Sequence, residues 1–277
     1  MELRSEDVFA EGVAILRKEK IASATTAARL LLCFVLGTKD FRAHTVSPAD
    51  AERFRTLIVQ HKAGCPVSKL IGSRAFWDQT FYVNENVLDP RPDSETLIEA
   101  VLQAIPENTT SSQILDLGTG SGCLLGTLLV HRPYMRGIGV DCSLQALFVA
   151  QKNAVRLGTA NRTHFICSNW TAALAQKHNF EVIISNPPYI SRRDIPALPK
   201  SVLYDPLIAL DGGEDGLACY REIASSIMPL LCHKGQLFLE VGQGQQRAVK
   251  KIFNILRYAQ SYKDLSGRVR VLQFIKE

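Results

Sequence analysis

From residue 113 onward, short apolar runs alternate with longer stretches that have helical periodicity. The apolar runs predict strands at residues 113–118, 136–141, 163–167, 181–185 and 235–241. Strands that alternate with helices pair in parallel through crossover helices, which builds a doubly wound α/β sheet. The final stretch predicts two more strands about Ser266-Gly267, an antiparallel hairpin at the sheet edge. We therefore expect a seven-stranded α/β sheet that ends in an antiparallel hairpin.

The residues before this sheet have a different pattern of apolar and polar side chains. Helical spacing extends from about residue 5 to 70, where Ser47 is an expected N-cap and Pro48 an expected first helical residue. Aromatic and β-branched residues then alternate with polar ones about Asp78-Gln79, as in a two-stranded ribbon. The chain is thus expected to contain a helical domain (1–74), a β-hairpin linker (75–90) and the α/β domain (91–277).

Composition narrows the class of protein. With 46% hydrophobic and 21% charged residues, the 277-residue chain is expected to be globular. The seven cysteines form no CxxC pair and the six histidines show no ligand spacing, which favours a reducing compartment and no metal site. The first residues are charged, unlike a signal peptide, and the longest early apolar run is too short to cross a bilayer, so a cytoplasmic location is expected.

Positive charge is concentrated at the start of the chain. Residues 1–74 carry 12 Lys and Arg against 8 Asp and Glu, which is +4 of the net charge of +5. Such an excess suits a negatively charged partner, and it equally suits a solvated helical surface.

A glycine-rich loop follows the first strand of the sheet. Gly118, Gly120 and Gly122 occupy the strand–helix junction, where glycines permit a tight turn and close approach of a ligand to the helix N-terminus. Asp141 ends the second strand, 23 residues after Gly118, close to the spacing of an acid that binds ribose hydroxyls. This pattern suits a nicotinamide dinucleotide or S-adenosylmethionine. The position of Asp116, two residues before the first glycine, and the terminal hairpin favour the methyl donor.

Two other strand ends belong to the same edge of the sheet. Trp170, after the third strand, is a candidate to pack against the adenine ring, or else a core residue. The fourth strand stops at Asn186-Pro187-Pro188-Tyr189. Two acceptors, the side-chain carbonyl of the Asn and the backbone carbonyl of the first Pro, would hold both hydrogens of a planar NH2 group while the aromatic ring stacks on it. A rigid Asn-Pro turn is the alternative interpretation, but its place beside the cofactor loop favours methylation of an amide or exocyclic amine.

These motifs also carry a family resemblance. "DLGTGSG", "VDCS", "SNW" and "SNPPYI" resemble class I methyltransferases of the NPPY type, which modify planar nitrogens of adenine, guanine or glutamine. "KLIGSRAFWDQTFYVNENVLDPRPDSETLIE", "DPLIALDGGEDGLACYREI", "EVGQGQ" and the helical N-terminal region resemble the HemK/PrmC family, protein-(glutamine-N5) methyltransferases that act on peptide chain release factors.

The resemblance implies a substrate and a set of site residues. The substrate is the glutamine of the release factor's Gly-Gly-Gln motif. The helical domain is expected to help dock the release factor, and the ribosome is a further expected neighbour. The implied catalytic and substrate-binding residues are Asn186, Pro187, Pro188, Tyr189 and Arg91. The implied contacts to S-adenosylmethionine are Asp116, Gly118, Thr119, Gly120, Ser121, Gly122, Asp141, Trp170 and Asn186.

Four features depart from the family pattern. Asn169 stands where an acid is more usual before the Trp, and Asp89 replaces an apolar residue before "PRP". "PDSE" stands for the usual "PETE", and Asp205 stands where Glu is common. Glutamine methylation of a ribosomal protein is the nearest alternative, although the loop "PRPDSE" differs from the "PRSP" of that enzyme. An rRNA guanine methyltransferase also stays open. A DNA adenine methyltransferase would need a recognition insertion, and a non-catalytic module would need a broken acceptor site.

Overall fold

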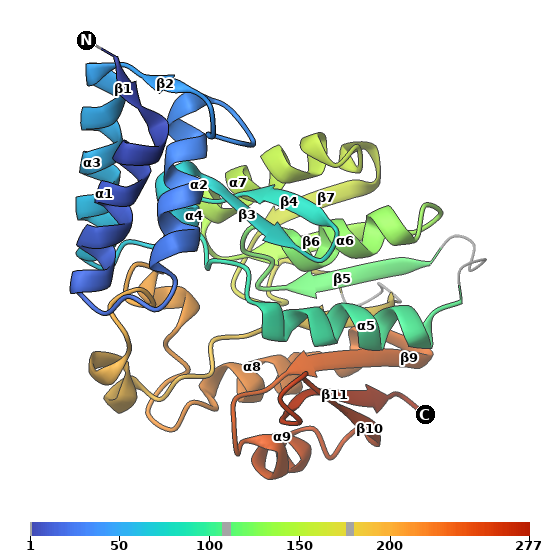
Figure 1. Cartoon of the computed structure of the whole chain (residues 1–277). Helices are drawn as coiled ribbons and strands as arrows, with labels where there is room; N and C mark the ends of the chain where they lie inside the picture. Colours follow the sequence, from blue (N-terminus) through green and yellow to red (C-terminus); the bar gives the residue numbers. More distant parts are fainter. Residues whose placement is uncertain (1, 107–111, 176–179) are drawn as a thin grey trace. The chain divides into compact units, whose positions relative to one another are not determined.

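The computed structural model describes residues 2–106, 112–175 and 180–277, and they fall into two compact units (Figure 1). One unit comprises Met1–Ser73 with Pro199–Tyr204, and the other comprises Arg74–Leu198 with Asp205–Glu277. None of the described helices combines the length and the hydropathy that a bilayer span requires.

The first unit is helical. Its elements are β1 (Leu3–Arg4), α1 (Ser5–Lys18), α2 (Ala24–Leu36), β2 (Thr45–Val46), α3 (Pro48–Lys62) and α4 (Val67–Ile71). The predicted start of α3 is confirmed: Ser47 Oγ accepts a hydrogen bond from the Asp50 N–H at 3.1 Å, and Pro48 is the first helical residue. Leu16, Leu31 and Phe54 are buried where the helices meet, and burial of such side chains stabilises the unit by about 1.5–3 kcal/mol each.

The second unit is built on a seven-stranded sheet. Its strands are β5 (Gln113–Leu117), β6 (Arg136–Asp141), β7 (Thr163–Cys167), β8 (Phe180–Ser185), β9 (Leu231–Glu240), β10 (Arg257–Lys263) and β11 (Val269–Ile275). Their order is β10-β11-β9-β8-β5-β6-β7. The pairs among β5 to β9 are parallel, whereas β11 is antiparallel to both β9 and β10. The predicted doubly wound sheet with a terminal antiparallel hairpin is confirmed.

Helices cover both faces of this sheet, which is why its central strands β5 and β8 are mostly buried. They are α5 (Glu95–Ala104), α6 (Cys123–His131), α7 (Leu144–Arg156), α8 (Ala218–Ser226) and α9 (Gln246–Ile252). Val182 and Ile184 of β8 pack in one core cluster with residues of α5 and α6, while Ile183 between them packs in another with residues of α8 and α9. The sheet thus separates two cores, and its carboxyl edge is left for loops.

The predicted ribbon is present as β3 (Ser73–Phe76) and β4 (Gln79–Tyr82). It is shorter than the predicted range of 75–90 and starts two residues earlier. Phe76 and Phe81 are buried in the same cluster as α5 and α6. The ribbon is therefore packed into the core of the second unit instead of forming a separate linker, because its two phenylalanines gain more by burial there than in solvent.

Candidate active site

The glycine-rich loop connects β5 to α6. The N–H groups of Gly118 and Thr119 both donate to the Val140 carbonyl of β6, at 2.8 and 2.9 Å, which folds the loop over the end of the sheet. Gly118, Gly120 and Gly122 have φ values of 77°, 54° and 75°, a region that residues with a Cβ rarely adopt. A Cβ on Gly122 would lie 3.2 Å from that of Ala150, so this glycine also lets α6 approach α7 closely.

Asp141 at the end of β6 holds the middle of this loop. Its Oδ2 accepts from the Gly120 N–H at 2.8 Å, and its Oδ1 accepts from the Ser143 N–H at 2.9 Å. Burial raises the pKa of Asp141, and these two hydrogen bonds oppose the rise. Each oxygen keeps a second lone pair, so the side chain suits a pair of ribose hydroxyl groups.

Asp116 lies beneath the loop. Its Oδ2 accepts from the Thr119 hydroxyl at 2.7 Å, whereas its Oδ1 has no hydrogen-bond partner within the described chain. Burial, and secondarily the charge of Asp141, raises the pKa of Asp116 to about 7. Because Asp116 is fully buried, its hydrogen bond with Thr119 supports the shape of the glycine loop.

Trp170 lies beside the glycine loop and lines the same cavity, with its ring about 3.5 Å from where a Cβ on Gly118 would lie. Its φ of 44° is unusual for a bulky residue and indicates a conformation imposed by the surroundings. Glu222 of α8 holds it there, since its carboxylate accepts from Trp170 Nε1 and from Asn169 Nδ2, each at 3.0 Å. The Asn that departs from the family pattern is thus the donor that this Glu requires.

The tetrapeptide begins where β8 ends. The Ser185 hydroxyl donates to the Leu117 carbonyl at 2.7 Å, which ties β8 to β5 beside the cofactor loop. Asn186 follows, and its Nδ2 donates to Ser94 Oγ at 3.1 Å. No hydrogen bond from a described residue to Asn186 Oδ1 or to the Pro187 carbonyl is present, and Asn186 lines the cavity at this edge of the sheet.

Three glycines pack against the end of the tetrapeptide. A Cβ on Gly216 would lie 2.5 Å from the Tyr189 carbonyl oxygen, and one on Gly212 or Gly242 would lie 2.8 or 3.0 Å from other Tyr189 atoms. Gln245 Nε2 also donates to the Tyr189 carbonyl at 2.9 Å. The segments "DGGEDG" and "EVGQGQ" therefore encase the tetrapeptide, which gives a physical reason for their glycines.

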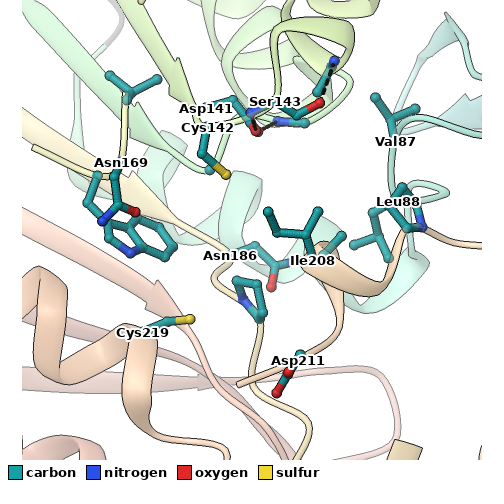
Figure 2. Close-up of a pocket in the computed structure, with 18 of the residues that line it drawn as sticks. Val87, Leu88, Asp141, Cys142, Ser143, Asn169, Asn186, Ile208, Asp211 and Cys219 are labelled. Atoms are coloured by element: carbon teal, nitrogen blue, oxygen red, sulfur yellow. Dashed lines mark hydrogen bonds between the residues drawn. The ribbon is translucent and has the colours of Figure 1, made fainter. Parts of the chain in front are cut away.

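A cavity of about 240 Å³ lies at this edge of the sheet (Figure 2). It brings together six of the predicted site residues, namely Gly118, Gly120, Asp141, Trp170, Asn186 and Pro188. The others do not line it. Asp116, Thr119 and Ser121 are buried, Gly122 is the N-cap of α6, and Pro187 and Tyr189 are outside the lining. Arg91 pairs instead with the buried carboxylate of Asp205.

Much of the cavity wall consists of residues that no sequence motif marks. The unpredicted lining residues are Asn86, Val87, Leu88, Cys142, Ser143, Ala146, Ser168, Asn169, Pro206, Ile208, Ala209, Asp211, Cys219 and Glu222, together with Val140. Several of them lie in the sequence blocks that resemble the family. The resemblance marks those blocks as characteristic of the family, but it does not show which of their residues line the cavity. Figure 2 shows Leu88 and Ile208 on the side of the cavity opposite Asn169. Asn186 lies between Asn169 and this apolar pair.

Two families of known proteins match the chain. The Methyltransferase small domain matches residues 91–201, and the PrmC N-terminal domain matches residues 7–72. The release factor glutamine methyltransferase of Rhodospirillum rubrum is 42% identical over 253 residues, which cover 88% of this chain and 77% of the relative. The enzyme of the same name from Cereibacter sphaeroides is 38% identical over 278 residues, 98% of each chain.

A solved structure agrees at the level of the fold. The 16S rRNA N2 G1207 methyltransferase of T. thermophilus, in complex with AdoMet and guanosine, superposes with a TM-score of 0.51 and 19% identity, over 74% of this chain and 50% of that one. The fold and the site define a class I methyltransferase that uses S-adenosylmethionine. The chain belongs to the family of release factor glutamine methyltransferases. The predicted family, enzyme class and cofactor are confirmed, while the roles of individual residues stay predictions.

The described residues contain no group of three or more His, Cys, Asp or Glu side chains that could hold a metal ion, and the seven cysteines are free.

Proposed function

We propose that the protein transfers the methyl group of S-adenosylmethionine to the side-chain amide nitrogen of the glutamine in the Gly-Gly-Gln motif of peptide chain release factors. The observation that carries the proposal is the arrangement of Asn186. Its NH2 group is engaged by Ser94, which leaves its carbonyl oxygen as an acceptor in a cavity that also contains Asp141 and the glycine loop.

The residues present fit the cofactor. Asp141 offers lone pairs to ribose hydroxyls, Trp170 offers a flat face for the adenine ring, and the glycines leave the backbone open to close approach. Bound S-adenosylmethionine supplies an electrophilic methyl group. Asp116, Thr119 and Ser121, beneath the loop, support its shape instead of lining the cavity.

The chain's own residues prepare the nucleophile. The lone pair of an amide nitrogen is delocalised, so it attacks poorly. Two acceptors, Asn186 Oδ1 and the Pro187 carbonyl, hold the two amide hydrogens and aim the developing lone pair, while Pro188 and the encased Tyr189 fix the loop. The contribution is positioning and electrostatic stabilisation, without a general base.

We further propose that the helical unit helps to dock the release factor and that the reaction takes place in the cytoplasm beside the ribosome. The family membership of both the helical and the catalytic regions supports this assignment, as does the positive charge of residues 1–74 toward an acidic partner.

Transfer of labelled methyl from S-adenosylmethionine to a purified release factor tests the proposal. Incorporation should occur with the factor alone and should disappear when the glutamine of its Gly-Gly-Gln motif is replaced. A ribosomal protein, free rRNA and DNA serve as the competing acceptors. Labelling of any of these, with the release factor unlabelled, would overturn the proposal.

A further inference from the structure

Arg270 connects the terminal hairpin with the segment that precedes α5. It lies in β11, and its side chain is 12% exposed. Its guanidinium group contacts two carboxylates. Nε lies 2.9 Å from Oδ2 of Asp264, in the turn between β10 and β11, and Nη2 lies 2.6 Å from Oδ2 of Asp93. Neither Arg270 nor Asp93 is among the residues that line the cavity, so neither has a part in the chemistry proposed above.

The hairpin fixes the position of this guanidinium group. Oδ1 of Asp264 accepts from the Ser266 hydroxyl at 2.6 Å and from the N–H groups of Ser266 and Arg268, each at 2.9 Å. Oδ2 of the same carboxylate accepts from Arg270 Nε. The Arg270 backbone carbonyl also accepts from the Val241 N–H at 2.8 Å. Both the backbone and the side chain of Arg270 are therefore held where Nη2 meets Asp93.

Asp93 belongs to a single turn that also contacts Asn186. The turn is the 3-10 helix η1 (Pro92–Ser94), and its N–H of Ser94 donates to the Arg91 carbonyl at 3.0 Å. The Ser94 side chain is buried, and its Oγ accepts from Asn186 Nδ2 at 3.1 Å. Since Asp93 and Ser94 are consecutive residues of one short turn, a shift of Asp93 displaces the hydroxyl that holds Asn186.

Residues on either side of Asp93 attach the same segment to other parts of the second unit. Arg91 forms its ion pair with the buried carboxylate of Asp205. The Glu95 carboxylate accepts from the Trp77 N–H of the β3–β4 ribbon at 2.8 Å. The ion pair with the hairpin adds an attachment between these two, at the residue next to the serine.

We propose that Arg270 is a positioning residue for methyl transfer: its ion pair with Asp93 holds the η1 turn, and through Ser94 it keeps the Asn186 amide aligned with the acceptor nitrogen. The inference rests on the proposed function, because it takes Asn186 as the group that binds the substrate's amide. Arg270 acts through the turn and not on the reacting atoms.

The magnitudes indicate that this ion pair matters more to turnover than to folding. The Asp93 side chain is 48% exposed, and ion pairs screened by solvent contribute little to stability. Displacement of a reacting group by about 1 Å, in contrast, lowers the rate by up to about 100-fold. A small shift of the turn is therefore expected to appear in kcat before it appears in the melting temperature.

Asp93→Ala in the full chain tests the inference. With release factor and S-adenosylmethionine both saturating, kcat should fall about 3- to 30-fold, because Asn186 is no longer held in alignment. The Kd for S-adenosylmethionine should stay within about threefold, since Asp93 does not line the cavity. The melting temperature should fall by less than about 4 °C. Asp93→Glu returns the carboxylate and should restore kcat to within about twofold of the wild type.

Arg270→Gln removes the other partner of the ion pair. It should lower kcat by a factor similar to that of Asp93→Ala, and it should lower the melting temperature further, because the Asp264 carboxylate loses its cation. Wild-type kcat in either Asp93→Ala or Arg270→Gln would overturn the inference. If Arg270→Gln does not fold, the Ala and Glu variants of Asp93 decide alone, and equal kcat in these two overturns the proposal.

Ser94→Ala shows whether the ion pair acts through the turn. Alone it should lower kcat, because the hydroxyl that holds Asn186 is removed. The double variant Asp93→Ala with Ser94→Ala should be no slower than the slower single variant, since both changes act on the alignment of Asn186. Losses of kcat that multiply in the double variant would overturn the inference, as would wild-type kcat in Ser94→Ala.

Ser266→Ala is the matched control. It removes one hydrogen bond to Oδ1 of Asp264 and leaves both ion pairs of Arg270 in place. It should lower the melting temperature while kcat stays within about twofold of the wild type. A fall in kcat like that of Asp93→Ala would mean that general loosening of the hairpin is responsible, and it would overturn the proposal.

The proposed function fails in a different way from this inference. A wild-type enzyme that does not label the release factor would refute the proposed function. The coupling between Asp93 and Ser94 would then be measured on whichever acceptor is labelled, and multiplied losses of kcat on that acceptor would still overturn the positioning role of Arg270.

Discussion

The backbone N–H of Asp89 donates a hydrogen bond to Oδ1 of Asp205 at 3.0 Å, although 116 residues separate them in the chain. The same carboxylate, with a side chain that is 0% exposed, forms an ion pair with Arg91. Asp89 and Arg91 follow the cavity-lining residues 86–88, and Asp205 precedes the lining residues 206, 208 and 209. One buried carboxylate thus joins two walls of the cavity. Asp89 and Asp205, which both depart from the family pattern, are the two residues that this hydrogen bond connects.

Asp205→Asn should lower the free energy of unfolding by about 1–3 kcal/mol, because hydrogen bonds to a charged group contribute about that much when buried and Arg91 stays partly exposed. Urea unfolding followed by circular dichroism measures the change. Asp215→Asn is the control: it breaks a pair with Arg221 in which both side chains are about half exposed, and it should cost less than about 1 kcal/mol. Equal losses of unfolding free energy in the two variants would contradict a stabilising role for the buried Asp205 carboxylate.

Asn186→Ala should lower kcat by roughly two to three orders of magnitude, the loss typical of a removed transition-state hydrogen-bonding group. Most of the wall around the cofactor does not depend on this side chain, so the Kd for S-adenosylmethionine should change by less than about tenfold. Calorimetric binding and single-turnover methyl transfer separate the two effects. Equal loss of binding and turnover would show that Asn186 serves the cofactor and not the substrate.

The fold was predictable because its signals are local. Strand and helix periods, the Ser47 cap and the Ser266-Gly267 turn each depend on neighbours in the chain, and so do the contiguous glycine loop and tetrapeptide. The supporting residues are not local: Ser94 meets Asn186 across 92 residues, and Glu222 meets Trp170 across 52. No periodicity marks such partners, since tertiary packing alone brings them together.

The partner of Arg91 was not predictable from the sequence either. The place of Arg91 in a family-like block predicts a contact to the substrate, but no short-range pattern shows that a buried carboxylate 114 residues away takes up its guanidinium group. The contact to the substrate stays a prediction, and the ion pair is what the structure shows.

Asp116 should make stability depend on pH. Its pKa in the folded protein is raised from 3.8 to about 7 by burial, so the ionised form is disfavoured in the folded state. The resulting destabilisation is absent below about pH 4, develops as the pH rises, and is complete above about pH 7, where it amounts to roughly 4 kcal/mol. Asp116→Asn removes this titration. The unfolding free energy of the wild type minus that of the variant should therefore fall between pH 4 and 8, and a constant difference would show that Asp116 ionises normally.

Glu222 should affect the affinity for the cofactor, because it holds Trp170, the residue proposed to pack against the adenine ring. Asn169→Asp would place a carboxylate against that of Glu222, and the repulsion would displace Trp170. The Kd for S-adenosylmethionine should rise about 5- to 30-fold, equivalent to about 1–2 kcal/mol. Isothermal titration calorimetry measures it.

A compensating change provides the decisive comparison. The double variant combines Asn169→Asp with Glu222→Gln. The NH2 group of the new glutamine can donate to the new carboxylate at residue 169, and the carbonyl oxygen of the same glutamine can accept from Trp170 Nε1. Both hydrogen bonds are then restored, and the one with residue 169 has its donor and acceptor exchanged. The Kd should recover to within about threefold of the wild type. Because charge repulsion is the stated cause of the loss, a double variant that binds as weakly as Asn169→Asp would refute it and would mean that residue 169 contacts the cofactor directly.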